Sequence, residues 1–193
     1  MICMATAETP LEFGNYSPDM ERLLYRSASI NKHFEDDFDV SFSSLLLAFL
    51  VSDDLVSQWF QSYIRQAGIN VQKILEERGL DRRTLDDIAA AAPIPSQGNL
   101  RMTTSARRFL QAAKQLSERL AGPGEKMPLE VSHLMAIFIY SPWVHEKDLI
   151  RWGFNRADWS NEFLKLMSSL NRRQMSFWRD LHHVTFGEEP AVQ

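Results

Sequence analysis

Cysteine is almost absent from this chain of 193 residues, because Cys3 is the only one. A single thiol cannot form an intrachain disulfide or a multi-cysteine zinc site, and such usage is typical of a reducing compartment. Long apolar runs are also missing: the longest, LLLAFLV at 45–51, is far shorter than the roughly 20 residues that cross a bilayer. The N-terminal sequence MICMATAETP does not have the pattern of a signal peptide. These absences favour a cytoplasmic protein with no membrane partner.

Positive charge is not in excess either. The chain has 21 Lys and Arg against 25 Asp and Glu, a net charge of −4 and a pI of about 5.7. Its arginines are scattered in short stretches such as DRRTL, ARRF and NRRQM, with carboxylates nearby. Because binding to phosphates needs a concentrated basic face, we expect no nucleic-acid partner. The 45% apolar and 24% charged residues are ordinary for a folded domain.

Catalytic and metal-binding motifs are missing as well. His182 and His183 are adjacent, so on a helix they point about 100° apart and cannot share an ion without a further ligand. Ser132 and His133 are neighbours without the strand-to-helix G-x-S-x-G turn of a hydrolase. We therefore predict no enzyme, no metal site and no cofactor, and a small hydrolase using scattered Glu, Asp and His residues is the disfavoured alternative.

Helix signals dominate what is present. Ser17 followed by Pro18 is typical of a helix start, and Thr103 or Thr104 is placed to cap a second long helix. Gly68 ends an amphipathic helix and Asn70 caps the next one. Apolar residues recur with helical spacing from 55 to 64, and the period-two alternation of strands is hardly seen. The sequence therefore predicts an all-α fold.

Three segments recur in the same order along the chain. YSPDMERLLYRSASIN from 16 resembles MTTSARRFLQAAKQLS from 102, which lies 86 residues later. SLLLAFL from 44 resembles HLMAIFI from 133, at an offset of 89, and GINVQKIL from 68 resembles GFNRADWSNEFL from 153, at an offset of 85. Because three similar offsets in one order rarely arise by chance, the pattern predicts a tandem of two related helical units.

The two units resemble the Clp N-terminal domain, the double repeat at the front of Clp unfoldases. The family pattern runs from a hydroxyl cap through a helix with Arg and Leu, an EHLLLALL segment and a further helix to a final helix opened by G-I-D or G-I-N. The matching residues of this chain are Ser17, Arg22, Leu24, Ser27, Leu45, Gly68 and Asn70 in the first unit, and Thr103, Arg108, Leu110, Ala113, His133, Leu134, Gly153 and Asn155 in the second.

The resemblance implies a pseudo-twofold arrangement of two repeats of about four helices each. Repeat one would span 16–92 and repeat two 102–167, with a loop at 93–101, an extended or disordered N-terminus at 1–15 and an extra C-terminal helix and tail at 168–193. The chain departs from the family in two ways. The glutamate-histidine pair of the EHLLLALL segment is Ser-Ser in the first unit and Ser-His in the second, and no G-x-x-x-x-G-K-S/T loop for ATP occurs.

His133 has two interpretations, as a ligand or base and as part of a buried helix. In the resembled family a histidine at this place packs and forms hydrogen bonds, so we expect a structural residue. The positive end of the helix dipole would also favour a neutral ring there.

The tryptophans of the second unit, Trp143, Trp152 and Trp159, are the candidate protein-binding residues. Amphipathic aromatic side chains at a rim give large contact areas to a partner, although packing in the core is the alternative. The apolar stripe in the C-terminal tail likewise predicts either packing onto the domain or a docking segment.

Function follows from the resemblance. It implies a non-catalytic recognition module that binds substrates or adaptors, as proteins or peptides, for an unfoldase or protease machine. The chain would be the front end of such a machine or a free-standing Clp regulator. A second hypothesis is an interaction or sensor domain of a different protease or effector protein.

Overall fold

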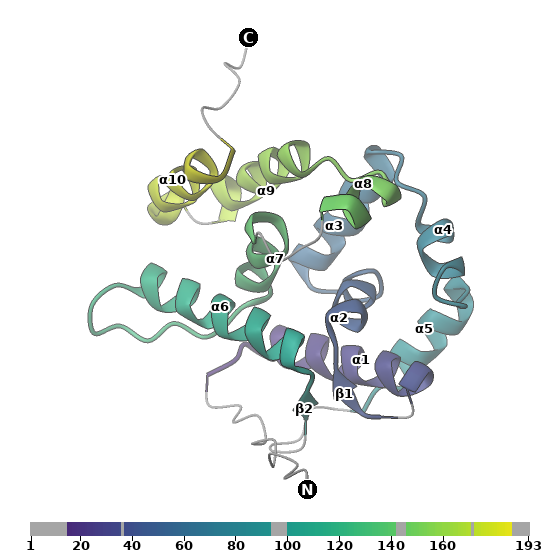
Figure 1. The fold of residues 1–193 in the computed structure, drawn as a ribbon. Helices are drawn as coiled ribbons and strands as arrows, with labels where there is room; N and C mark the ends of the chain where they lie inside the picture. The colour runs from purple at the N-terminus through teal and green to yellow at the C-terminus, as the bar shows by residue number, and fades with distance from the viewer. Residues whose placement is uncertain (1–14, 36, 94–99, 142–145, 171, 187–193) are drawn as a thin grey trace, which may run out of the picture.

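The computed structural model describes residues 15–35, 37–93, 100–141, 146–170 and 172–186. They form ten α-helices and two very short strands, so the predicted all-α class is confirmed (Figure 1). The helices are α1 (Pro18–Glu35), α2 (Phe42–Phe49), α3 (Leu55–Gln66), α4 (Val71–Glu76), α5 (Arg82–Ala90), α6 (Thr104–Ala121), α7 (Val131–Tyr140), α8 (Glu146–Trp152), α9 (Arg156–Leu170) and α10 (Met175–Phe186). The strands are β1 (Asp39–Val40) and β2 (Arg101–Met102), and a 3₁₀ turn, η1 (Arg172–Gln174), precedes α10.

The two long helices begin at the predicted hydroxyl caps. Ser17 Oγ accepts the amide of Met20 at 3.2 Å at the start of α1, and Thr103 Oγ1 accepts the amide of Ala106 at 3.3 Å at the start of α6. Each cap satisfies one of the amides that the first turn of a helix leaves unpaired. The boundaries of these helices are therefore local properties of the sequence.

Two short apolar helices occupy the centre of the fold. Helix α2 buries all its residues from Ser44 to Phe49, and α7 buries every residue except Ile137. A helix that is apolar on nearly all sides must be covered on all sides. Helix α1 packs on α2 and α6 packs on α7, so the long amphipathic helices provide much of this cover (Figure 1).

Phenylalanine rings join α2, α6 and α7. The ring of Phe42 stacks on that of Phe138 at 5.0 Å and lies 4.8 Å from that of Phe109, while Phe49 meets Phe138 edge-on at 5.4 Å. Offset and edge-on pairs of this kind add about 0.5–1.5 kcal/mol each beyond burial of their area. The centre of the molecule is thus an interlocked contact between elements far apart in sequence.

Two short backbone pairings, which the sequence analysis did not foresee, tie distant segments together. Strands β1 and β2 are parallel, with Val40 opposite Met102, and Tyr16 forms a parallel bridge with Leu129. A strand of two residues is too short for a period-two pattern, so these pairings leave no signal in the sequence.

The C-terminal tail packs onto the domain over the described residues. Helix α10 lies against α9 and α7, and the ring of the buried Trp178 meets that of Phe163 edge-on at 5.6 Å (Figure 1). Of the two interpretations of the tail, packing onto the domain is therefore the one observed, and a docking segment with an uncovered apolar face is not. Helix α9 reaches Leu170, three residues beyond the expected end of the second unit at 167.

In the described ranges, none of the helices combines the length and the apolar character that crossing a bilayer requires.

Replacing Leu45 or Leu134 with Asp is expected to unfold the domain. Both side chains are fully buried, and an unpaired carboxylate there costs several kcal/mol, a large fraction of the stability of a domain. Thermal and urea unfolding followed by circular dichroism measure the effect. Leu55→Asp is the matched control, because Leu55 is 55% exposed at the first residue of α3, where a negative charge is favoured. Wild-type melting of either core variant would contradict this account of the centre.

Truncating Trp178 to Ala is expected to lower the free energy of unfolding by about 3–5 kcal/mol, because it leaves a cavity under α10. Urea unfolding midpoints compared with those of Phe34→Ala provide the test, since Phe34 is 40% exposed. Equal midpoints for the two variants would show that α10 contributes little to stability.

Candidate protein-binding surface

Of the three tryptophans predicted to contact a partner, the two that the structure describes are buried. Trp159 is 0% exposed and Trp152 is 8% exposed, while Trp143 lies outside the described residues. The prediction that Trp159 contacts a partner is therefore wrong, because its side chain has no surface to offer. For Trp152 too, core packing, the alternative interpretation, is what burial favours.

Trp159 lies within an aromatic cluster between α3 and α9. Its ring stacks on that of Phe60 at 5.4 Å and on that of Tyr63 at 6.3 Å, and lies 5.1 Å from that of Phe154. Among the described residues, the Trp159 indole N–H has no hydrogen-bond acceptor. This tryptophan therefore contributes volume and ring contacts rather than polar recognition.

Trp152 connects α8 to the end of α4. Its indole N–H donates to Glu77 Oε2 at 2.9 Å, and the guanidinium of Arg151 is 3.1 Å from the same oxygen. Because one carboxylate takes both donors, the polar edge of Trp152 is already occupied within the chain. The indole N–H of Trp152 is therefore not available to a partner.

His133 is a structural residue, as expected. Its Nδ1 accepts the amide of Glu130 at 3.0 Å, closing the cap of α7, and the side chain is 2% exposed. Burial lowers the pKa of His133 to about 4, so the ring is neutral near pH 7. The neighbouring hydroxyl of Ser132 donates to Glu130 Oε2 at 3.4 Å, so the two neighbours do not form a nucleophile–base pair.

A different serine and histidine do meet in the core. Ser160 Oγ on α9 lies 2.8 Å from His182 Nδ1 on α10, and both side chains are buried. A substrate cannot reach this pair, so its role is to join two helices. Among the described residues there is no group of three His, Cys, Asp or Glu side chains placed to hold a metal ion.

The remaining motif residues mark helix ends and surfaces. Gly68 and Gly153 have φ of +67° and +90°, the left-handed backbone that favours glycine after a helix. Asn70 and Asn155 each accept the amide three residues later, at 3.1 and 3.2 Å. On the surface, Arg22 pairs with a carboxylate of its own helix and Arg108 is exposed on α6.

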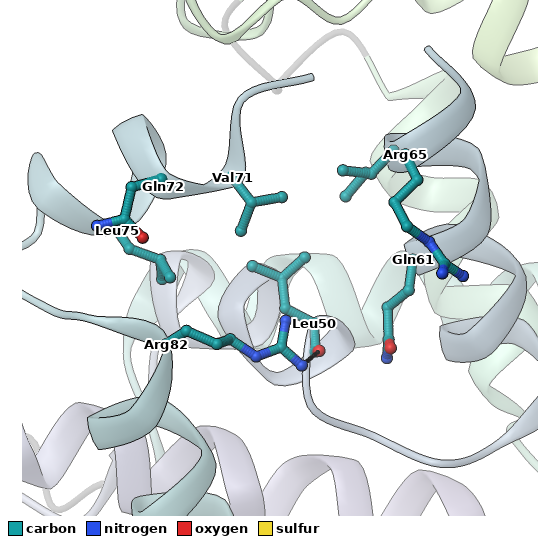
Figure 2. A pocket seen from close by; sticks show the side chains of 8 residues that line it. Leu50, Gln61, Arg65, Val71, Gln72, Leu75 and Arg82 are labelled. Carbon is teal, nitrogen blue, oxygen red and sulfur yellow. Dashed lines mark hydrogen bonds between the residues drawn. The ribbon is translucent and has the colours of Figure 1, made fainter. Parts of the chain in front are cut away.

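A groove between α3 and α4, here called the α3–α4 groove, is the best candidate for binding a partner. Its volume is about 460 Å³, within the range of roughly 300–1,000 Å³ found for ligand sites. Figure 2 shows α3 side chains on one side, α4 side chains facing them, and Leu50 and Arg82 between the two. The lining residues are Leu50, Gln61, Ile64, Arg65, Val71, Gln72, Leu75 and Arg82.

Hydrogen bonds to backbone carbonyls hold the polar floor of the groove in place. Gln61 Nε2 donates to the carbonyls of Phe49 and Ser52, each at 2.9 Å, and Arg82 Nη2 donates to the carbonyl of Leu50 at 3.0 Å (Figure 2). These bonds satisfy carbonyls at and after the end of α2, which the helix leaves without partners. The side chains are therefore ordered before any ligand arrives.

Sequence reasoning missed this groove. The apolar residues Leu50, Ile64 and Leu75 were recognisable as core positions, but the polar residues at the rim come from separate helices and form no motif. Leu55 was grouped with the buried stripe of α3 and is exposed instead. A residue's neighbours across helices are not encoded in its local spacing.

Acid is expected to destabilise the protein through His133. In the unfolded chain the pKa of histidine is about 6.5, against about 4 when folded, so below pH 6.5 the unfolded state binds a proton that the folded state does not. Stability from this group is complete above pH 6.5 and is lost as the pH falls to about 4, by about 3 kcal/mol in total. Urea unfolding at several pH values measures it.

His133→Asn removes this titration and keeps an acceptor for the Glu130 amide. Its stability should therefore fall less than that of the wild type between pH 6.5 and 4. His33→Asn, at an exposed position of α1, is the control and should follow the wild type. Parallel curves for wild type and His133→Asn would contradict the assignment.

No protein-family model, no curated protein and no solved structure matches the chain. The arrangement of its helices and the chemistry of its surface are therefore the features that bear on its function.

Proposed function

We propose that this chain is a non-catalytic protein-recognition module, built as a tandem of two related helical units in the manner of the Clp N-terminal domain. The first unit contains α1 to α5 within 16–92, and the second contains α6 to α9, beginning at 102. Helix α10 is an addition to the second unit. The observation that carries the proposal is that two backbone pairings join the units, and that they use equivalent residues of each.

Each unit pairs with the other through equivalent residues. Tyr16 and Met102 are related by the offset of 86, and Val40 and Leu129 by the offset of 89. The bridge between Tyr16 and Leu129 therefore becomes the pairing of Met102 with Val40 when the two units are exchanged. This is the relation expected of a pseudo-twofold axis between two copies of one motif.

The hydrogen bonds beside these bridges have the same relation. The amide of Ser17 donates to the carbonyl of Leu129 at 2.9 Å, and the amide of Thr103 donates to the carbonyl of Val40 at 3.0 Å. Both donors are the residues that cap the long first helix of their unit. Equivalent caps therefore form equivalent bonds to the opposite unit.

The starts of α2 and α7 agree as well. In α2 the amide of Ser41 donates to Ser44 Oγ at 3.0 Å, and in α7 the amide of Glu130 donates to His133 Nδ1 at 3.0 Å, with an offset of 89 for both pairs. These side chains differ in chemistry but close the same kind of cap, which accounts for the departure of the first unit from the family's histidine.

Packing between the units supports the same interpretation. Helix α2 contacts α6 as α7 contacts α1, and α3 contacts α9 as α8 contacts α4. When α1 to α4 are exchanged with α6 to α9 in order, the α2–α6 contact becomes the α7–α1 contact, and the α3–α9 contact becomes the α8–α4 contact. Four elements of each unit thus have a counterpart, while α5 and α10 have none.

Protein recognition is the function that this scaffold supports best. In the resembled domain such a double unit recruits substrates and adaptors to an unfoldase by transient binding, which needs a modest interface and an affinity in the micromolar range. The α3–α4 groove offers ordered polar groups beside apolar side chains, as such an interface requires. The one Ser–His pair described above is closed to substrates, which favours a binding role over a catalytic one.

Affinity capture from lysate of the host, read by mass spectrometry, tests this function. The wild-type chain is expected to enrich an AAA+ unfoldase, its protease or its adaptor, and the unfolded Leu134→Asp variant serves as the control for adhesion to exposed apolar surface. Enrichment of an unrelated protease or effector instead would favour the second hypothesis, a sensor or interaction domain of another system. A wild-type chain that enriches nothing beyond the control would overturn the proposal.

A further inference from the structure

The lining of the α3–α4 groove has a charge opposite to that of the whole protein. The chain carries a net charge of −4, yet the described residues that line the groove include two arginines and no Asp or Glu. Its other lining residues are the amides of Gln61 and Gln72 and four apolar side chains. Such a lining favours a ligand that brings both negative charge and an apolar group.

Arg65 is available to such a ligand. Its side chain is exposed, it has no ion pair within the described part of the chain, and its one hydrogen bond is a long one of 3.3 Å from Nη2 to Ser62 Oγ. Arg82, in contrast, already binds Asp86 through Nε at 3.0 Å and the carbonyl of Leu50 through Nη2. Arg65 is therefore the cation best placed to gain a new partner.

Gln61 adds a feature typical of peptide recognition. Because its Nε2 donates to two carbonyls of the chain, its Oε1 is the atom left to accept a hydrogen bond. Figure 2 shows Gln61 and Arg65 on the α3 side of the groove and Val71 and Leu75 on the α4 side. An acceptor for a backbone N–H thus lies beside a cation for a carboxylate and opposite apolar side chains.

We propose that the α3–α4 groove binds an acidic peptide segment of a partner protein, with an apolar side chain against the half-buried Val71 and a neighbouring carboxylate on the exposed Arg65. The backbone of the segment donates an N–H to Gln61 Oε1. This inference rests on the proposed function and names the chemistry of the partner. None of the described residues that line the groove is aromatic, so they offer no platform on which a nucleic-acid base would stack.

Fluorescence anisotropy with short labelled peptides tests the proposal. The first probe carries leucines flanked by Asp and Glu, the second replaces each acidic residue with Lys, and the third replaces the leucines with Ser. The wild-type chain is expected to bind only the first, and more weakly as salt is added, because screening weakens exposed ion pairs. Arg65→Glu should weaken this binding at least tenfold, since an attraction becomes a repulsion.

Arg83→Glu is the matched control, because it makes the same change of charge on an exposed residue of α5 that does not line the groove. Its affinity should stay within about twofold of wild type, and circular dichroism confirms that both variants fold. Equal weakening by the two variants would mean that only net charge matters, and equal binding of the Lys probe would exclude an acidic ligand. Either result, or no binding of the first probe, overturns the inference.

Lysate capture with the same variants separates this inference from the proposed function. If the wild-type chain and Arg65→Glu enrich an unfoldase or adaptor equally, the recognition function stands and another surface carries it. If Arg65→Glu alone loses a protein that the wild type and Arg83→Glu retain, the groove is the site. If the wild type enriches nothing, the proposed function itself fails.

Discussion

The need to bury α2 and α7 on all sides shapes the rest of this molecule. Both helices are too apolar to face water, and neither is long enough to be stable by itself. The long amphipathic helices α1 and α6 each cover one of them, and the rings of Phe42, Phe109 and Phe138 close the space between. The loops, caps and short strands lie where this central arrangement requires the chain to turn.

Three polar side chains inside this core, His133, Ser160 and His182, serve structure and have partners arranged by the fold. His133 is neutral because burial disfavours the charged ring, and one of its nitrogens caps the helix in whose first turn it lies. A hydrogen bond between Ser160 and His182 likewise joins α9 to α10. Such satisfied pairs look like catalytic residues in a sequence, but their burial removes them from chemistry with a substrate.

Surface chemistry, in contrast, comes from residues that are distant in sequence. The α3–α4 groove draws its lining from three helices and the residue after α2, and an acidic protein presents two guanidinium groups there. Trp152 and Trp159, two of the tryptophans singled out as binding residues, are instead buried, because large aromatic side chains gain most when they leave water entirely. In the proposed recognition function, a modest groove with fixed polar groups suits a partner that must later be released.

The sequence by itself determined the helices and their ends. Ser17 and Thr103 cap helices where they were expected, Gly68 and Gly153 end them with left-handed backbone, and His133 is the structural residue that its position predicted. These are local effects, since a cap or a glycine acts on residues within one turn.

Only the tertiary structure decided which tryptophans are buried, that Leu55 is exposed, and that Gln61, Arg65 and Val71 share a groove. It also brought Tyr16 to Leu129 and Val40 to Met102. Helical periodicity assigns a residue to a face of its own helix but not to the partner that covers that face. Contacts between helices depend on how the whole set packs around α2 and α7, which no short stretch of sequence contains.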